Sequence, residues 1–213
     1  MEKELNFLIL TKSARFKGNC VVGIDLDSNR LIRLVSNNNE IKNSISDKNM
    51  TCQNGELALQ KDIVKIKIIQ PLPTKYQPEN MLIDDGYKWQ KIRKSTFKDV
   101  EPYISNDEHI FGDNMPYLME TNIAEIKKSI IIAKVNDIKI YTQRKQYDTG
   151  EIKEKTKIDF SYKSSQYSNF SVTDRYYFGK NDILAKALII VSLPSDSYKG
   201  YRYKFVSQIF KCD

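Results

Sequence analysis

The chain has 213 residues, of which 40% are hydrophobic, and 34 lysines and arginines against 27 aspartates and glutamates give it a net charge of +7. This hydrophobic content supports a packed core, so the composition excludes a disordered tail. The charge is compatible with a polyanionic partner without requiring one. Three cysteines and no C-x-x-C pair argue against a disulfide framework or a zinc ribbon, and indicate a reducing compartment.

The chain begins with strand-like patterns. The apolar run at residues 7–10 is too short for a signal peptide or a membrane span, which favours a cytoplasmic protein without membrane contact. Residues 19–27 and 30–36 alternate on either side of Ser28-Asn29 and predict a hairpin with a tight turn. In the second of these strands, alternation places Arg33 beside Val35, so Arg33 need not face bulk water.

The next segments alternate between loop and strand. Polar residues 37–60 predict a long loop with one helical turn, and residues 62–73 predict a half-buried strand closed by two prolines. Together with the strands before them, they give roughly four to five strands, the count of a small Greek-key barrel. We assign this first barrel to residues 1–83. Residues 84–115, which include the only tryptophan, Trp89, are interpreted as a connector with a short helix between residues 91 and 100.

The remaining residues, 116–213, predict a second barrel. Strand patterns recur at residues 129–145, 155–174, 188–191 and 201–211, rich in β-branched and aromatic residues. The fold class is therefore mainly β. A short echo links the two halves: "RFKGN" ends at Asn19 and "SYKGY" ends at Tyr201, each between strand patterns. We interpret the echo as an equivalent corner that starts a hairpin in each barrel.

Several ordered blocks resemble the bacterial dual OB-containing domain family. They are "LTKSARFKGNCVVGIDLD…RLIRLVS", "YQPENMLID", "HIFGDN", "SVTD" and "VSLPSDSYKGYRYKFVSQIF", spread over nearly the whole chain. The resemblance implies two OB-like barrels and a nucleic-acid-binding role in a bacterial defence or mobile-element setting. It brings no catalytic residues. Family members often have Trp where this chain has Leu31, which puts one stacking side chain in doubt.

The first candidate binding surface surrounds the early hairpin. Basic grooves with aromatic platforms bind nucleic acid in OB folds. The basic and small residues of this surface are Lys12, Ser13, Arg15, Lys17, Arg30 and Arg33, with Phe16, Tyr76 and Trp89 as platforms. The alternative interpretation is a solvated basic loop beside core aromatics. Gln77 and Asn80 either contact a base edge or tie the neighbouring segment together through hydrogen bonds.

The second candidate surface is the closing strand, "YKGYRYKF". It interleaves cations and aromatics at strand spacing, which suits phosphate contact and base stacking. Its residues are Lys199, Tyr201, Arg202 and Lys204, with Tyr198 and Tyr203 beside them. In the alternative interpretation the tyrosines Tyr201 and Tyr203 face the core and the cations face water.

Catalysis is not favoured. A single histidine, His109, leaves little for a catalytic triad or a multi-histidine metal site. Cys20 lies in an alternating strand and is interpreted as a small buried residue, although a functional role stays open. A metal-dependent nuclease using Asp25 and Asp27 is a less favoured alternative, because aspartate is common beside turns. We expect no metal, no cofactor and no catalytic residues.

The sequence therefore predicts a non-catalytic module that binds single-stranded DNA or RNA. The alternative is a protein-interaction adaptor in a multi-protein complex, because OB-like barrels also bind proteins and fold does not fix function.

Overall fold

The computed structural model describes residues 2–123, 127–146 and 150–212. The chain divides into two compact units, Met1–Tyr103 and Ile104–Asp213, each built mainly of β-strands. The boundary falls inside the segment expected as a separate connector. Residues 84–103 belong to the first unit and residues 104–115 to the second, which corrects that expectation.

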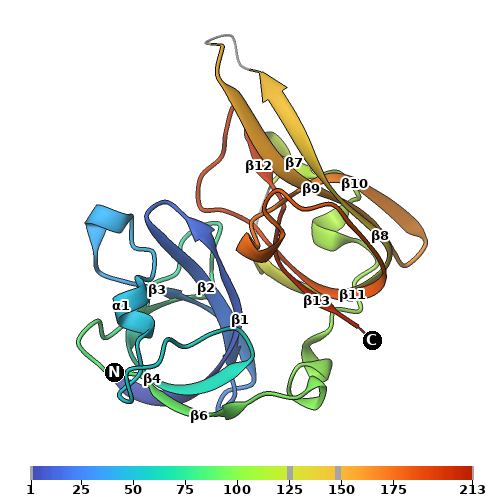
Figure 1. Ribbon diagram of the computed structural model, residues 1–213. Coiled ribbons are helices and arrows are strands. Elements are labelled where there is room, and N and C mark those ends of the chain that lie inside the picture. Colours follow the sequence, from blue (N-terminus) through green and yellow to red (C-terminus); the bar gives the residue numbers. More distant parts are fainter. Residues whose placement is uncertain (1, 124–126, 147–149, 213) are drawn as a thin grey trace. The chain divides into compact units, whose positions relative to one another are not determined.

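The first unit is a ring of strands (Figure 1). Its sheet order is β1-β2-β3-β5-β4-β6, and β1 also pairs with β4, which closes the ring. The pairs are antiparallel except β3–β5, which is parallel. The strands are β1 (Lys3–Arg15), β2 (Gly18–Asp25), β3 (Arg30–Val35), β4 (Asp62–Pro71), β5 (Asn80–Ile83) and β6 (Gln90–Lys94). The predicted hairpin around Ser28-Asn29 is confirmed as β2–β3.

The core of this ring forms because alternate strand residues point inward and a short helix covers them. Helix α1 (Asp47–Met50) contributes the buried Met50 to the same cluster as Trp89 and Phe7. Gly23 lets β1 and β2 approach closely: a Cβ at this position would lie 2.0 Å from the carbonyl oxygen of Leu8. Close packing of β1 against β2 therefore requires a glycine at position 23.

Short 3-10 helices complete the first unit: η1 (Asn39–Ile41), η2 (Phe97–Asp99) and η3 (Glu101–Tyr103). The helix expected between residues 91 and 100 is only the single turn η2. Residues 91–94 instead continue β6, which pairs with β4. Pairing with an exposed sheet edge outweighed the local helical pattern.

The second unit contains a closed barrel of the order β10-β13-β11-β8-β9, and β7 and β12 form a separate two-stranded ribbon. Figure 1 shows β8 and β9 running on together as a long arm. The strands are β7 (Tyr117–Met119), β8 (Ile130–Gln146), β9 (Ile152–Tyr162), β10 (Ser165–Val172), β11 (Asp182–Ser192), β12 (Tyr201–Tyr203) and β13 (Phe205–Lys211). The 3-10 helices are η4 (Ile110–Gly112), η5 (Glu120–Asn122) and η6 (Arg175–Tyr177).

Both rings have the same topology. In chain order, β8, β9, β10, β11 and β13 pair as β1, β2, β3, β4 and β5 do, including one parallel pair between the third and fifth strands. The interior of the second ring is more aromatic: Phe160 stacks on Tyr167 with ring centroids 5.1 Å apart, and Phe170 packs edge-on against both. The predicted fold class, mainly β with two OB-like barrels, is confirmed.

The echo between the two halves is not an equivalence. Arg15 pairs with Gly18, so Phe16 and Lys17 form the turn between the first and second strands. Tyr198 bridges Tyr201, so Lys199 and Gly200 form a turn between the fourth and fifth strands of the second ring. The two corners occupy different places in the topology, and their predicted equivalence is wrong. The shared letters reflect residues that suit tight turns.

Candidate nucleic-acid interface

Burial divides the predicted binding residues into two groups. One group is exposed by 4% or less: Ser13, Arg33, Gln77, Asn80, Trp89, Arg202 and Lys204. The other keeps exposed or half-buried side chains: Lys12, Arg15, Lys17, Arg30, Lys199 and Tyr201. A fully buried side chain in the folded chain does not reach a surface ligand. The first group therefore has structural positions, which corrects the expectation that it lines a binding surface.

Arg33 braces the first ring. Ile32 and the three residues after it in β3 are all buried, so both faces of this strand are covered and alternation does not lead Arg33 to water. Its guanidinium donates a hydrogen bond to Sγ of Cys20 at 2.9 Å, from β3 across to β2. Trp89 is 1% exposed within the core and offers no ring face for stacking.

Two other predicted residues tie down the connection between β4 and β5. The Nδ2 of Asn80 donates to Oε1 of Gln77 at 3.3 Å, and the backbone of Gln77 pairs with that of Thr74. These contacts match the structural alternative for Gln77 and Asn80. Ser13, in β1, pairs with Cys20.

The second candidate surface differs from both interpretations of its sequence, because Arg202 and Lys204 are buried while Tyr201 is partly exposed. Arg202 donates to the carbonyl of Pro194 at 2.7 Å and to Oε1 of Glu120 at 3.1 Å. The ammonium of Lys204 donates to Oδ1 of Asp113 at 2.6 Å and to the carbonyls of Ile110 and Asp113. Burial lowers the pKa of Lys204, while Asp113 opposes that shift. The cations therefore point inward and hold distant segments together.

The tyrosines of the same motif lie on the opposite face. Tyr201 pairs with Met119 and Tyr203 with Tyr117 across the β7–β12 ribbon, so the four side chains share one face. The ring of Tyr117 meets those of Tyr201 and Tyr203 edge-on at 4.8 and 6.0 Å. Tyr201 is 37% exposed. The second motif thus exposes aromatic surface, with Lys199 as its exposed cation.

The exposed residues of the first motif gather on the β1–β2 turn. Phe16 is 57% exposed, and its backbone adopts a φ of 47°. The ammonium of Lys42 lies 4.3 Å from the centroid of its ring, and the guanidinium of Arg15 lies 5.9 Å away. Lys17, next in the turn, is exposed. This turn combines an aromatic ring with positive charge.

A second aromatic–cation pair lies on the connection from β4 to β5. The ammonium of Lys75 is 5.1 Å from the ring centroid of Tyr76, which is half-buried. That connection ends at Asn80, which pairs with Arg33 of β3, whereas the β1–β2 turn leads into β2. The β4–β5 connection therefore ends beside β3, and the β1–β2 turn lies at the start of β2.

Two predicted cations of the first unit already have partners within the chain. The ammonium of Lys12 forms an ion pair with Asp47 at 3.0 Å, and its side chain is 11% exposed. Arg30 is exposed beside the β2–β3 turn and donates to the hydroxyl of Ser28 at 3.2 Å. Of the two, Arg30 has the more accessible charge.

Sequence reasoning missed Lys42 and Lys75. Both lie in polar connections, and neither follows a strand period. The available signal for Lys75 was its position beside Tyr76. For Lys42 there was none, because residues 36–43 must fold back before it meets Phe16; the backbone amide of Ser36 donates to the carbonyl of Asn43.

The residues considered for catalysis have structural contacts. Asp25 is buried and accepts hydrogen bonds from the amides of Asp27 and Ser28, which fixes the β2–β3 turn. His109 lies 3.4 Å from the hydroxyl of Tyr167 through Nδ1. Within the described ranges, no group of three or more His, Cys, Asp or Glu side chains is placed to hold a metal ion.

Two OB-like rings in one chain define the class of protein. The chain matches the profile of the dual OB-containing domain over residues 5–209, and it belongs to this family. We found no matching protein among curated proteins and no match among solved structures. No helix in the described part of the chain is long and apolar enough to cross a membrane. In OB folds, the surface of the second and third strands and the loops beside it bind oligonucleotides and oligosaccharides.

Proposed function

We propose that the chain is a non-catalytic module that binds single-stranded nucleic acid along the exposed connections of its first unit. These connections are the β1–β2 turn and the β4–β5 connection, which adjoin β2 and β3. Arg15, Lys17, Lys42 and Lys75 contact phosphates, and Phe16 stacks on a base. The family resemblance extends the proposal to a role in a bacterial defence or mobile-element system.

The single observation that supports this proposal most is the position of Phe16. A bulky side chain at a positive φ is disfavoured, and a tight turn normally selects Gly or Asn there. Phe16 is also 57% exposed, so folding recovers little of the free energy of burying its ring. Stability does not explain an exposed aromatic ring at this place, whereas base stacking between cations does.

The test is a fluorescence anisotropy titration with labelled single-stranded DNA and RNA oligonucleotides at several salt concentrations. Released counterions should make log K fall with log [salt], with a slope near −0.7 for each phosphate contacted. Phe16→Ala should weaken binding about tenfold, as expected for one base–aromatic stack. Lys17→Glu should weaken binding and flatten the salt slope.

Lys98→Glu is the matched control for charge. Lys98 is exposed on η2, beyond β6, which pairs with β4 and not with β2 or β3. Its substitution should leave affinity unchanged. Absence of binding at low salt, or equal losses for Lys98→Glu and Lys17→Glu, would contradict the proposal.

One observation favours the adaptor function as a second candidate. The shared face of Tyr117, Met119, Tyr201 and Tyr203 on the β7–β12 ribbon is composed of residue types enriched in protein interfaces. If oligonucleotides do not bind at low salt, a partner that co-purifies in fixed stoichiometry and dissociates on Tyr201→Ala would establish this function instead.

A further inference from the structure

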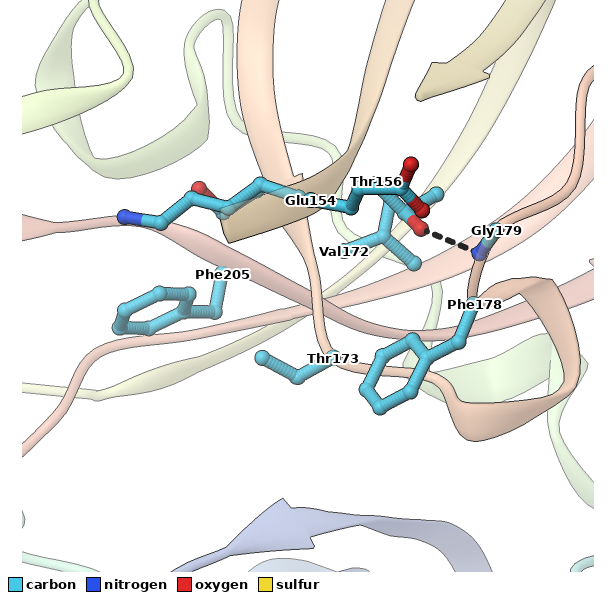
Figure 2. A pocket seen from close by; sticks show the side chains of 9 residues that line it. Glu154, Thr156, Val172, Thr173, Phe178, Gly179 and Phe205 are labelled. Atoms are coloured by element: carbon cyan, nitrogen blue, oxygen red, sulfur yellow. Dashed lines mark hydrogen bonds between the residues drawn. The ribbon is translucent and has the colours of Figure 1, made fainter. Parts of the chain in front are cut away.

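The second unit contains a pocket of about 420 Å³ where the end of β10, the start of β13 and the β10–β11 connection meet (Figure 2). This volume lies within the range of small-ligand pockets. Its apolar wall is formed by Val172, Phe178 and Phe205, and in Figure 2 Thr173 lies between the two phenylalanines. Phe178 is 49% exposed at the rim.

Hydrogen bonds fix the connection that carries Phe178. The hydroxyl of Thr156 donates to the carbonyl of Tyr177 at 3.2 Å and accepts from the amide of Gly179 at 3.1 Å, the dashed line in Figure 2. At its start, the carboxylate of Asp174 accepts from the amide of Tyr176 and from Nε2 of Gln208. Anchored on both sides, the wall exists before any ligand arrives, which lowers the entropic cost of binding.

Charge at the pocket is positive once the existing contacts are counted. Glu154 also lines it, but its carboxylate accepts from Nε of Arg144 at 2.7 Å. Lys157 points inward to the carbonyl of Asn169 and the hydroxyl of Ser171. Lys155 is exposed on β9 at the pocket, and among the described residues no ion pair engages it. A ligand that fits has an aromatic plane for the phenylalanines and an anion for Lys155.

We propose that this pocket binds one nucleotide, with its base against Phe178 and Phe205 and its phosphate at Lys155. The placement of that nucleotide within a bound single strand rests on the proposed function. Binding of a free mononucleotide does not. The pocket residues lie on the second, third and fifth strands of the ring and on the connection that follows the third.

The first experiment titrates the whole protein with uridine 5′-monophosphate, followed by ¹⁹F NMR of protein labelled with 4-fluorophenylalanine. The resonances of Phe178 and Phe205 should shift on binding and are assigned by Phe178→Leu and Phe205→Leu. Phe178→Ala should weaken nucleotide binding about tenfold. Lys155→Glu should weaken it for uridine monophosphate but not for uridine, because only the monophosphate has the anion.

Two controls match these variants. Tyr176 is a 62% exposed aromatic on the same connection and does not line the pocket, so Tyr176→Ala should leave binding unchanged. Lys134 is exposed on β8 and does not line the pocket, so Lys134→Glu is the control for the charge change in Lys155→Glu and should leave binding unchanged. Unchanged affinity in Phe178→Ala, or an equal loss of affinity in Tyr176→Ala, would overturn the assignment of the site.

The second experiment separates this proposal from the proposed function. An oligonucleotide with a single 5-iodouracil is cross-linked to the protein by light, and the modified peptide is mapped by mass spectrometry. Cross-links at Phe178 or Phe205 support a nucleotide of the bound strand in the pocket. Strand binding without cross-links or fluorine shifts here overturns the pocket and leaves the function intact. Mononucleotide binding without strand binding supports the pocket and overturns the function. An aromatic peptide that binds here in place of nucleotide overturns the pocket proposal.

Discussion

The two units have the same strand order but expose different side chains at comparable places. In the first unit, cations and aromatics lie together on the connections beside the second strand and before the fifth. In the second unit, the connection before the fifth strand buries Arg202 and Lys204 and leaves tyrosines half-exposed. Topology fixes where a connection lies. The partners available to each side chain decide which of its residues reach solvent.

The parallel pair of strands sharpens this contrast. In the first ring it joins Arg33 to Asn80, and the guanidinium of Arg33 occupies buried space beside it. In the second ring it joins Ser171 to Phe205, and both residues line the pocket. The second ring also has a buried cation near this pair: Lys157 of β9, whose ammonium donates to the hydroxyl of Ser171. The same topology therefore has a buried arginine side chain beside the parallel pair in the first unit and a pocket beside it in the second.

The largest difference in stability between the two units is expected from a substitution at Gly23. Gly23→Ala places a Cβ within 2.0 Å of a backbone carbonyl, which only movement of the strands relieves. The free energy of unfolding of the first unit should fall by about 3 kcal/mol. Hydrogen exchange should rise in residues 2–103 and stay unchanged in residues 104–212. Gly86→Ala is the control, since its Cβ meets only a carboxylate oxygen of Asp84 at 3.3 Å. Equal loss in both units would contradict this expectation.

The next effect tests whether the buried cations of the second unit are structural. Lys204→Met removes the partner of Asp113 and of two carbonyls, and should lower the free energy of unfolding by about 2 kcal/mol. Chemical denaturation measures this loss. The salt slope of oligonucleotide binding should not change, because Lys204 contacts no phosphate. A flatter slope with unchanged stability would place Lys204 on the binding surface.

A smaller effect, of opposite sign in stability and binding, is expected at Phe16. Phe16→Gly relieves a positive φ of 47° and should raise the free energy of unfolding by about 0.5 kcal/mol. The same variant should weaken oligonucleotide binding about tenfold through loss of a stack. Thermal unfolding and anisotropy titration measure the two effects. If both stability and affinity fall, the ring of Phe16 supports the fold and not the ligand.

The β architecture was predictable from sequence because alternation and turn residues act locally. The pattern of residues 19–36 predicted the β2–β3 hairpin, and the recurring strand patterns predicted two barrels. The prediction of a connector with a helix at residues 91–100 was wrong because residues 90–94 pair with β4. That strand starts at Asp62, nearly thirty residues earlier, so the local sequence does not reveal the pairing.

The candidate site was less predictable because burial of charge depends on distant partners. Arg202 meets Glu120 across 82 residues, and Lys204 meets Asp113 across 91. Alternation in a strand assigns residues to faces, but it does not say that the charged face of β12 is the covered one. The turn at Phe16 is local, and the sequence placed Arg15, Phe16 and Lys17 in the first candidate surface. Their role in binding stays a prediction.

The smallest effects concern two aspartates at short 3-10 helices. Asp99 is the last residue of η2 in the first unit, and Asp174 is the N-cap of η6 in the second. Hydrogen bonds from Arg93 hold the pKa of Asp99 well below its ordinary 3.8. Burial raises the pKa of Asp174 from the same value, although backbone donors oppose the shift. These two aspartates should therefore make the stabilities of the two units depend on pH in opposite directions.

The sign follows from proton linkage. Asp99 has a depressed pKa, so its stabilisation is present above pH 3.8 and is lost as pH falls. Asp174 has a raised pKa, so the native state holds its proton more tightly and stability falls as pH rises from 3.8 through the native pKa. The destabilisation caused by Asp99→Asn should grow between pH 3 and pH 6, and that caused by Asp174→Asn should shrink. Urea unfolding across this range measures both. Parallel pH trends would mean that the two aspartates share one environment.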